Sequence, residues 1–126
     1  MVASSSNRQP PSLSPIGVLQ VQCLSDSERW FGDSVACHSL PHHSLALAGE
    51  VGEFCNIVKK IDRGSLDIKD AKVRYDLQME ITDVFVYLLN IAGLIGVDLE
   101  KSYKHVRALN EERFMAQRAE REAKNG

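Results

Sequence analysis

Two pairs of acidic residues lie inside apolar stretches of the chain. Glu50 and Glu53 stand in LALAGEVGEF, and Glu80 and Asp83 stand in MEITDVF. The members of each pair are three residues apart, so on a helix they share one face, where like charges repel. Uncompensated charge among core residues is also costly. Two such pairs predict four carboxylates that converge on a cation, and the alternative is exposed acids paired with Lys and Arg.

The ligand type indicates which cation these carboxylates would bind. Oxygen ligands suit Mg²⁺ or Mn²⁺ and do not suit Zn²⁺. A di-iron bundle uses Glu-x-x-His on two of its helices. In this chain the position of the histidine is taken by Glu53 after Glu50 and by Asp83 after Glu80. A bound divalent ion lowers the pKa of a water, and Mg²⁺ takes substrate phosphates as further ligands. The predicted reaction class is hydrolysis of a phosphate ester or anhydride.

Two further side chains share helix faces with the carboxylates. Lys60 follows Glu53 by seven residues and Tyr87 follows Asp83 by four, and both spacings return to nearly the same side of a helix. We predict that Lys60 neutralises substrate phosphates and that Tyr87 hydrogen-bonds a phosphate or a sugar. The structural alternatives are a basic helix end for Lys60 and a core tyrosine with a satisfied hydroxyl for Tyr87.

Asn110 and Arg113 lie three residues apart near the end of the chain, in line with Val106 on an apolar stripe. An amide on such a stripe needs a partner, which is either a nucleotide or a neighbouring helix. Arg113 can bind phosphate through two parallel hydrogen bonds or pair with a surface acid. We therefore predict both residues as substrate contacts, with these structural roles as the alternatives.

Aromatic residues and histidines precede the first acidic pair. His42 and His43 stand just before it and are expected at the surface, although they are close enough in sequence to reach a substrate. Trp30 and Phe31 are expected to plug one end of the folded domain, and the alternative is stacking on a base.

Four helical segments must position these residues. Apolar residues recur at helical spacing over about 15–31, 41–61, 68–95 and 99–114. The expected boundaries are N-caps at Ser14, Asp67 and Asp98 and helix ends at Gly64 and Gly96. No stretch alternates with a period of two, so strands are not predicted. Four helices with short connections predict an all-α fold resembling a four-helix bundle.

The third helical segment is the most apolar part of the chain. Its apolar residues cover more than one face, as shown by Ile81, Val84, Phe85, Leu88, Leu89, Ala92 and Ile95. A helix that is apolar on several sides is buried on several sides. We therefore predict that a second copy of the chain covers part of it, in a homodimer or a tetramer.

The length of the chain suits one domain. It has 126 residues, of which 44% are hydrophobic and 25% are charged, and single domains cluster at about 100–150 residues. Residues 1–13 are rich in Ser, Pro and polar side chains, so we predict a disordered tail there. Residues 14–118 form the predicted helical domain, and the polar end 119–126 is expected to fray.

Charge and cysteine content argue against several classes of protein. The net charge of −2 gives no bulk attraction to nucleic acid or membranes, and the aromatic content is only 6%. No apolar run approaches the ~20 residues that a bilayer span needs, and the N-terminus lacks a signal-peptide pattern. The three cysteines lack Cys-x-x-Cys spacing, which fits a reducing cytosol. We expect a cytoplasmic protein without a membrane or a nucleic acid polymer as partner.

The segments LALAGEVGEF, EITDVFVYLLNIAGLIGVDL and NEERF resemble the MazG-like nucleotide pyrophosphohydrolases, which belong to the all-α NTP pyrophosphatase superfamily. The resemblance covers roughly residues 29–114. It implies Mg²⁺-dependent cleavage of a (d)NTP between the α and β phosphates, giving a (d)NMP and pyrophosphate. It also implies dimers, or tetramers built from dimers, with residues of two subunits at one site.

The resemblance assigns roles residue by residue. It implies that the metal ligands are Glu50, Glu53, Glu80 and Asp83, and that positions at or near nucleotide contacts are Lys60, Tyr87, Asn110 and Arg113. Val106 stands where many relatives carry Lys, and Lys60 stands where cytosine-selective relatives carry Trp. The base and sugar preference therefore stays open.

Three interpretations compete at this point. In the leading one, a pyrophosphohydrolase binds Mg²⁺, with Mn²⁺ as a substitute, and Glu53 is the catalytic base. The second is a non-catalytic helical dimer that binds nucleotides or a partner protein, and buried like-charge pairs argue against it. The third is a di-metal oxidase, and the absence of Glu-x-x-His argues against that.

Overall fold

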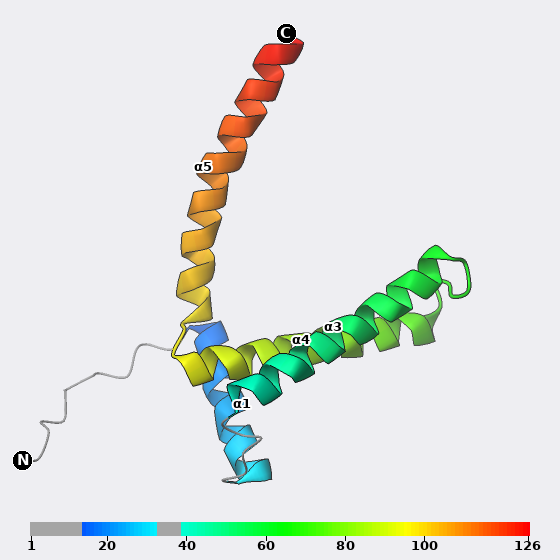
Figure 1. Ribbon diagram of the computed structural model, residues 1–126, viewed down its shortest axis with the longest axis vertical. Coiled ribbons are helices and arrows are strands. Elements are labelled where there is room, and N and C mark those ends of the chain that lie inside the picture. Colours follow the sequence, from blue (N-terminus) through cyan, green and yellow to red (C-terminus); the bar gives the residue numbers. More distant parts are fainter. Residues whose placement is uncertain (1–13, 33–38) are drawn as a thin grey trace, which may run out of the picture. The chain divides into compact units, whose positions relative to one another are not determined.

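The computed structural model describes residues 14–32 and 39–126, and the regular structure of these residues is entirely helical (Figure 1). This confirms the all-α prediction. The predicted tail, residues 1–13, lies outside the described residues. The helices are α1 (Pro15–Phe31), α3 (Leu40–Asp62), α4 (Ala71–Ile95) and α5 (Leu99–Asn125).

The helix boundaries follow local capping signals. Gly96 ends α4 in the left-handed conformation with φ of 72°, and the Asp98 carboxylate accepts a hydrogen bond of 3.0 Å from the Lys101 N–H at the start of α5. Both were predicted. The predicted cap at Asp67 is wrong, because α4 is capped by Asp70. The Asp67 carboxylate instead accepts the Lys69 N–H at 2.8 Å in a preceding turn, which delays the helix.

The described residues divide into two compact units. The first comprises residues 19–32 and 39–97, and the second comprises residues 14–18 and 98–126. In the first unit, α3 and α4 lie side by side and run in opposite directions (Figure 1). The C-terminal part of α1 packs on the end of α4, where Leu24 approaches Gly93. The Gln20 amide nitrogen donates a hydrogen bond of 2.8 Å to the Val97 carbonyl. This unit carries both acidic pairs.

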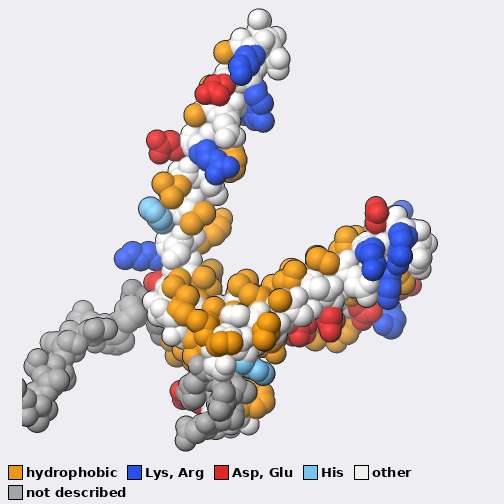
Figure 2. Space-filling view, viewed as in Figure 1, with side chains coloured by type: hydrophobic (Ala, Val, Ile, Leu, Met, Phe, Trp, Pro, Cys, Tyr) orange, Lys and Arg blue, Asp and Glu red, His pale blue; other side chains and the backbone are white. Residues whose placement is uncertain are grey.

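The first unit buries few hydrophobic side chains. Those that are buried among the described residues are Val73, Leu89 and Ala92. Many large apolar side chains of α4 stay exposed, and apolar side chains gather along the α3–α4 pair (Figure 2). The exposed ones on α4 include Met79, Ile81, Phe85, Val86, Leu88 and Ile95. A folded chain rarely leaves so large an apolar surface uncovered without a partner.

The second unit contains α5, which has no buried residue. Its apolar stripe is exposed along its length, at Tyr103, Val106, Leu109, Phe114 and Met115. The helix continues to Asn125, so the fraying expected from residue 119 is not seen. Residues with high helix propensity and an ion pair of 2.8 Å between Arg118 and Glu122 support this last stretch.

By length and composition alone, α4 is apolar enough to cross a membrane. The core helix of a soluble protein passes the same test, and Glu80 and Asp83 lie within α4. The predicted absence of a membrane partner therefore stays a prediction.

Two glycine substitutions test how closely α1 packs on α4. An alanine Cβ at Gly93 would lie 2.6 Å from Cδ1 and 2.8 Å from Cγ of Leu24, whereas one at Gly49 would meet nothing within 4 Å. Overpacking costs about 1–3 kcal/mol, and the gain in helix propensity is about 1 kcal/mol. We expect Gly49→Ala to raise the free energy of unfolding by about 1 kcal/mol and Gly93→Ala to lower it. Urea denaturation followed by circular dichroism measures both, and equal stabilisation by the two variants would contradict the packing of Leu24 on α4.

Candidate functional site

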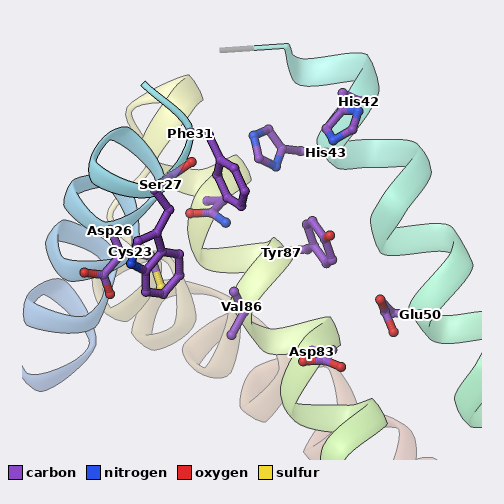
Figure 3. A pocket seen from close by; sticks show the side chains of 12 residues that line it. Cys23, Asp26, Ser27, Phe31, His42, His43, Glu50, Asp83, Val86 and Tyr87 are labelled. Carbon is purple, nitrogen blue, oxygen red and sulfur yellow. The ribbon is translucent and has the colours of Figure 1, made fainter. Parts of the chain in front are cut away.

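The antiparallel pairing of α3 and α4 brings three predicted carboxylates together. Glu50 comes from α3, and Glu80 and Asp83 come from neighbouring turns of α4. One carboxylate oxygen of each residue lies within 4.8 Å of the others, and all three residues are half-buried. Figure 3 shows Glu50 and Asp83 on facing sides of the gap between the helices. Glu53, the fourth predicted ligand, is exposed on α3.

The electrostatics of this cluster centre on Glu80. Its Oε2 atom is buried and has no hydrogen-bond partner within the described part of the chain. The pKa of Glu80 is raised to about 7, chiefly by burial and also by hydrogen bonds with Glu50 and Glu53 and by the negative charges of these two residues. Carboxylates so close together need either a shared proton or a cation. Glu53 is close enough to Glu80 to raise its pKa, although Glu53 lies outside the group formed by Glu50, Glu80 and Asp83.

Among the described residues, no basic side chain forms an ion pair with the cluster. The ion pairs recorded over residues 14–32 and 39–126 join other residues. This counts against the alternative in which the four acids are ordinary surface partners of Lys and Arg. The set of hard oxygen donors without a basic partner matches what Mg²⁺ or Mn²⁺ requires.

A cavity of about 600 Å³ extends from the carboxylates along the helices. Glu50 and Asp83 line it, and the Tyr87 ring lies between Asp83 and the His43 imidazole (Figure 3). The ring centroids of His43 and Tyr87 are 6.1 Å apart. The other residues that line the cavity are Cys23, Asp26, Ser27, Trp30, Phe31, His42, Val86 and Asn90. The arrangement offers acidic oxygen ligands on one side and aromatic surfaces on the other.

Several cavity residues differ from the sequence prediction. His43 is buried, with 5% of its surface exposed, whereas a surface position was expected. The sequence signal for a site position was that His43 precedes Glu50 by seven residues, a spacing that places the two side chains on one face of α3. Trp30 and Phe31 are more than half exposed and line the cavity, so neither is a buried plug within the described unit. Asn90 was not predicted at all.

The cavity also contains a thiol. Burial first, and then the negative charge of Asp26, raises the pKa of Cys23. The thiol therefore stays protonated near neutral pH and is not an activated nucleophile. Cys23 and Cys55 are both free, and the third cysteine, Cys37, lies outside the described residues.

Of the predicted substrate contacts, Tyr87 lines the cavity and Lys60 does not. Lys60 is exposed in the last turn of α3, where its carbonyl accepts the Ser65 N–H at 2.9 Å. This is the basic helix end that was the alternative for Lys60, and contact with phosphate stays a prediction.

Asn110 and Arg113 lie on α5, in the other compact unit, and are exposed. The Arg113 guanidinium carbon lies 4.7 Å from the centre of the Phe114 ring, a cation–π contact. Asn110 lines a shallow groove of α5 with neighbours that include Tyr103 and Phe114. A role for either residue at the substrate stays a prediction.

Comparison with known proteins gives an alignment with a phage protein. The chain is 36% identical over 66 residues to the "Gene 37 protein" of Mycobacterium phage L5. The alignment covers 52% of this chain and 58% of the phage protein, so the chain spans less than two thirds of that relative. The name of the phage protein states no activity. No protein-family model matches the chain, and no solved structure matches it significantly.

Proposed function

We propose that this chain is a divalent-metal-dependent nucleoside triphosphate pyrophosphohydrolase of the MazG-like kind. It would cleave a (d)NTP to a (d)NMP and pyrophosphate. The observation that carries the proposal is the group formed by Glu50, Glu80 and Asp83, whose oxygens lie within 4.8 Å of one another without a basic partner over residues 14–32 and 39–126. The adjoining cavity has room for a nucleotide, since small-molecule sites occupy roughly 300–1,000 Å³.

The four carboxylates divide into two roles. Glu50, Glu80 and Asp83 are the proposed ligands of Mg²⁺, with Mn²⁺ as a substitute, because they lie closest together. When bound, the ion would neutralise phosphate charge and lower the pKa of a water. Glu53 is exposed and outside this group, so its carboxylate is the one left to accept a proton from the attacking water.

The substrate contacts follow from the cavity. Tyr87 lies beside the carboxylates, where its hydroxyl can hydrogen-bond a phosphate or a sugar. Lys60, Asn110 and Arg113 remain proposed contacts, on the strength of the resemblance of their sequence positions to nucleotide contacts in MazG-like enzymes. The proposed location is the cytoplasm.

The proposal includes a homodimer or a tetramer. The exposed apolar side chains of α4 and the uncovered stripe of α5 support it, because burying such surface against a second copy is the main favourable term in association. In such an assembly the helices of two chains would complete the four-helix bundle. Neither membranes nor nucleic acid polymers are proposed partners.

Hydrolysis of a panel of NTPs and dNTPs tests the activity. The full chain is incubated with Mg²⁺, and phosphate is assayed with and without inorganic pyrophosphatase. We expect phosphate only in the presence of the coupling enzyme, because cleavage between the α and β phosphates releases pyrophosphate. Phosphate without it would indicate cleavage at the γ phosphate. The absence of product from every nucleotide, with Mn²⁺ as well, would contradict the proposal and favour the non-catalytic binding protein.

A further inference from the structure

The cavity wall contains a buried amide that lacks a partner. Asn90 of α4 is only 8% exposed and lines the cavity. Its Oδ1 atom has no hydrogen-bond partner within residues 14–32 and 39–126. Native proteins satisfy nearly all such buried polar atoms, so an exception calls for an explanation. Gln20 provides the contrast, because it is equally buried but its amide donates to the Val97 carbonyl at 2.8 Å.

The position of Asn90 relates it to the carboxylates. It follows Asp83 by seven residues, which is about two helical turns, or about 10 Å, along the same face of α4. Tyr87 lies between them in sequence and also lines the cavity. The Asn90 amide and the Asp83 carboxylate are therefore two polar groups that line one cavity, with Tyr87 between them along the helix sequence.

The surroundings of the amide suit a flat ring. Aromatic side chains from three helices line the cavity, with Trp30 and Phe31 from α1, His43 from α3 and Tyr87 from α4. Aromatic faces stack on any base and do not distinguish one base from another. An amide does distinguish them, because its carbonyl and N–H₂ groups match the donor and acceptor pattern of one ring edge.

We infer that Asn90 determines the specificity of this cavity: a planar nitrogen heterocycle stacks among the aromatic side chains and donates an N–H group to Asn90 Oδ1. This inference rests on the proposed function, since it places the phosphates of the same ligand toward Glu50 and Asp83. A ring without a donor at that edge leaves the buried oxygen unpaired. Sites of this type reject ligands that lack the matching group far more strongly than apolar pockets do.

The single tryptophan of the chain gives a direct readout of ring binding. Trp30 lines the cavity, and the chain has no other tryptophan, so its indole N–H gives one isolated signal in a ¹⁵N-correlated NMR spectrum. The full chain is titrated with the four deoxynucleosides, which carry no phosphate and therefore do not depend on the carboxylates or on a metal. We expect at least one deoxynucleoside to shift the signal, and the four dissociation constants to differ by about 10-fold or more.

Substitution of Asn90 is the decisive step. Asn90→Leu keeps the branching at Cγ but removes the amide, and we expect it to weaken binding of the preferred deoxynucleoside by about 10-fold or more and to bring the four constants close together. Gln20→Leu is the matched control, because it removes an equally buried amide outside the cavity, and it should keep the order of the four. Asn90→Ala replaces Asn90→Leu if circular dichroism shows that the leucine variant does not fold.

The outcomes separate this inference from the proposed function. An unchanged order of affinities in the Asn90 variants, or no shift of the Trp30 signal with any deoxynucleoside, would overturn the inference even if the protein hydrolyses nucleotides. Binding that depends on Asn90 in a protein without hydrolytic activity would support the inference and contradict the proposed pyrophosphohydrolase.

Discussion

Replacing Glu80 with glutamine is expected to make the metal-free protein more resistant to unfolding at pH 8 and to remove its stabilisation by Mg²⁺. Burial, above all, raises the pKa of Glu80 from its usual 4.5 to about 7, with further contributions from Glu50 and Glu53. At pH 8 the wild-type carboxylate is therefore charged in a place that favours the neutral form. Glutamine has nearly the same shape and no charge, so it relieves this penalty.

The direction of the pH dependence follows from proton binding. Between about pH 4.5 and about pH 7 the folded chain holds a proton on Glu80 that the unfolded chain has lost. The free energy of unfolding therefore falls as the pH rises through this window, and the loss is complete above it. The Glu80→Gln variant lacks this titration. Its stability relative to the wild type should increase from pH 4.5 to pH 7 and stay constant above that.

Melting temperatures in EDTA between pH 5 and pH 8 measure this difference. Asp76→Asn is a suitable control, because Asp76 is another α4 carboxylate but is paired with Lys72 at 2.7 Å, and its removal should not stabilise the chain. Added Mg²⁺ should raise the melting temperature of the wild type and leave that of Glu80→Gln unchanged. A Glu80→Gln variant that is less stable than the wild type in EDTA at pH 8 would show that the charged carboxylate is already well satisfied.

The helix boundaries could be predicted largely from signals in the local sequence. Capping residues and glycine stops act within a few residues, so the ends of α1 at Phe31 and of α4 before Gly96 could be predicted from the sequence. The error at Asp67 has the same origin, because Asp67 and Asp70 are both good caps and the turn between them decides which one starts α4.

The site was predictable only in part. The spacing of Glu50, Glu80 and Asp83 on two helices implied that they would meet, because an antiparallel helix pair brings such faces together. The unpaired Asn90 oxygen could not be predicted, because it is a property of the packed structure and not of the residue type. A partner for the exposed apolar stripe of α5 could not be identified from the sequence either, because such a stripe does not specify what binds it.

The largest loss of activity is expected from Glu53→Gln. Glu53 lies on the same face of α3 as Glu50, one turn later, but it is exposed and is not part of the group within 4.8 Å. Its carboxylate is thus available to take a proton from water, and glutamine cannot do this. General-base catalysis contributes about 10²–10⁴-fold to a rate, so we expect the turnover number to fall by about that factor.

The response of the melting temperature to Mg²⁺ shows whether Glu53 acts as a base or as a metal ligand. If Glu53 is the base, Glu53→Gln should still show a rise of the melting temperature with Mg²⁺, because Glu50, Glu80 and Asp83 remain to hold the ion. Loss of the Mg²⁺ response together with turnover would instead assign Glu53 as a metal ligand. Asp62→Asn, which alters another exposed acid of α3, should leave both properties unchanged. A Glu53→Gln variant that retains most of the wild-type turnover would rule out the catalytic role, since no amide can replace a carboxylate as a base.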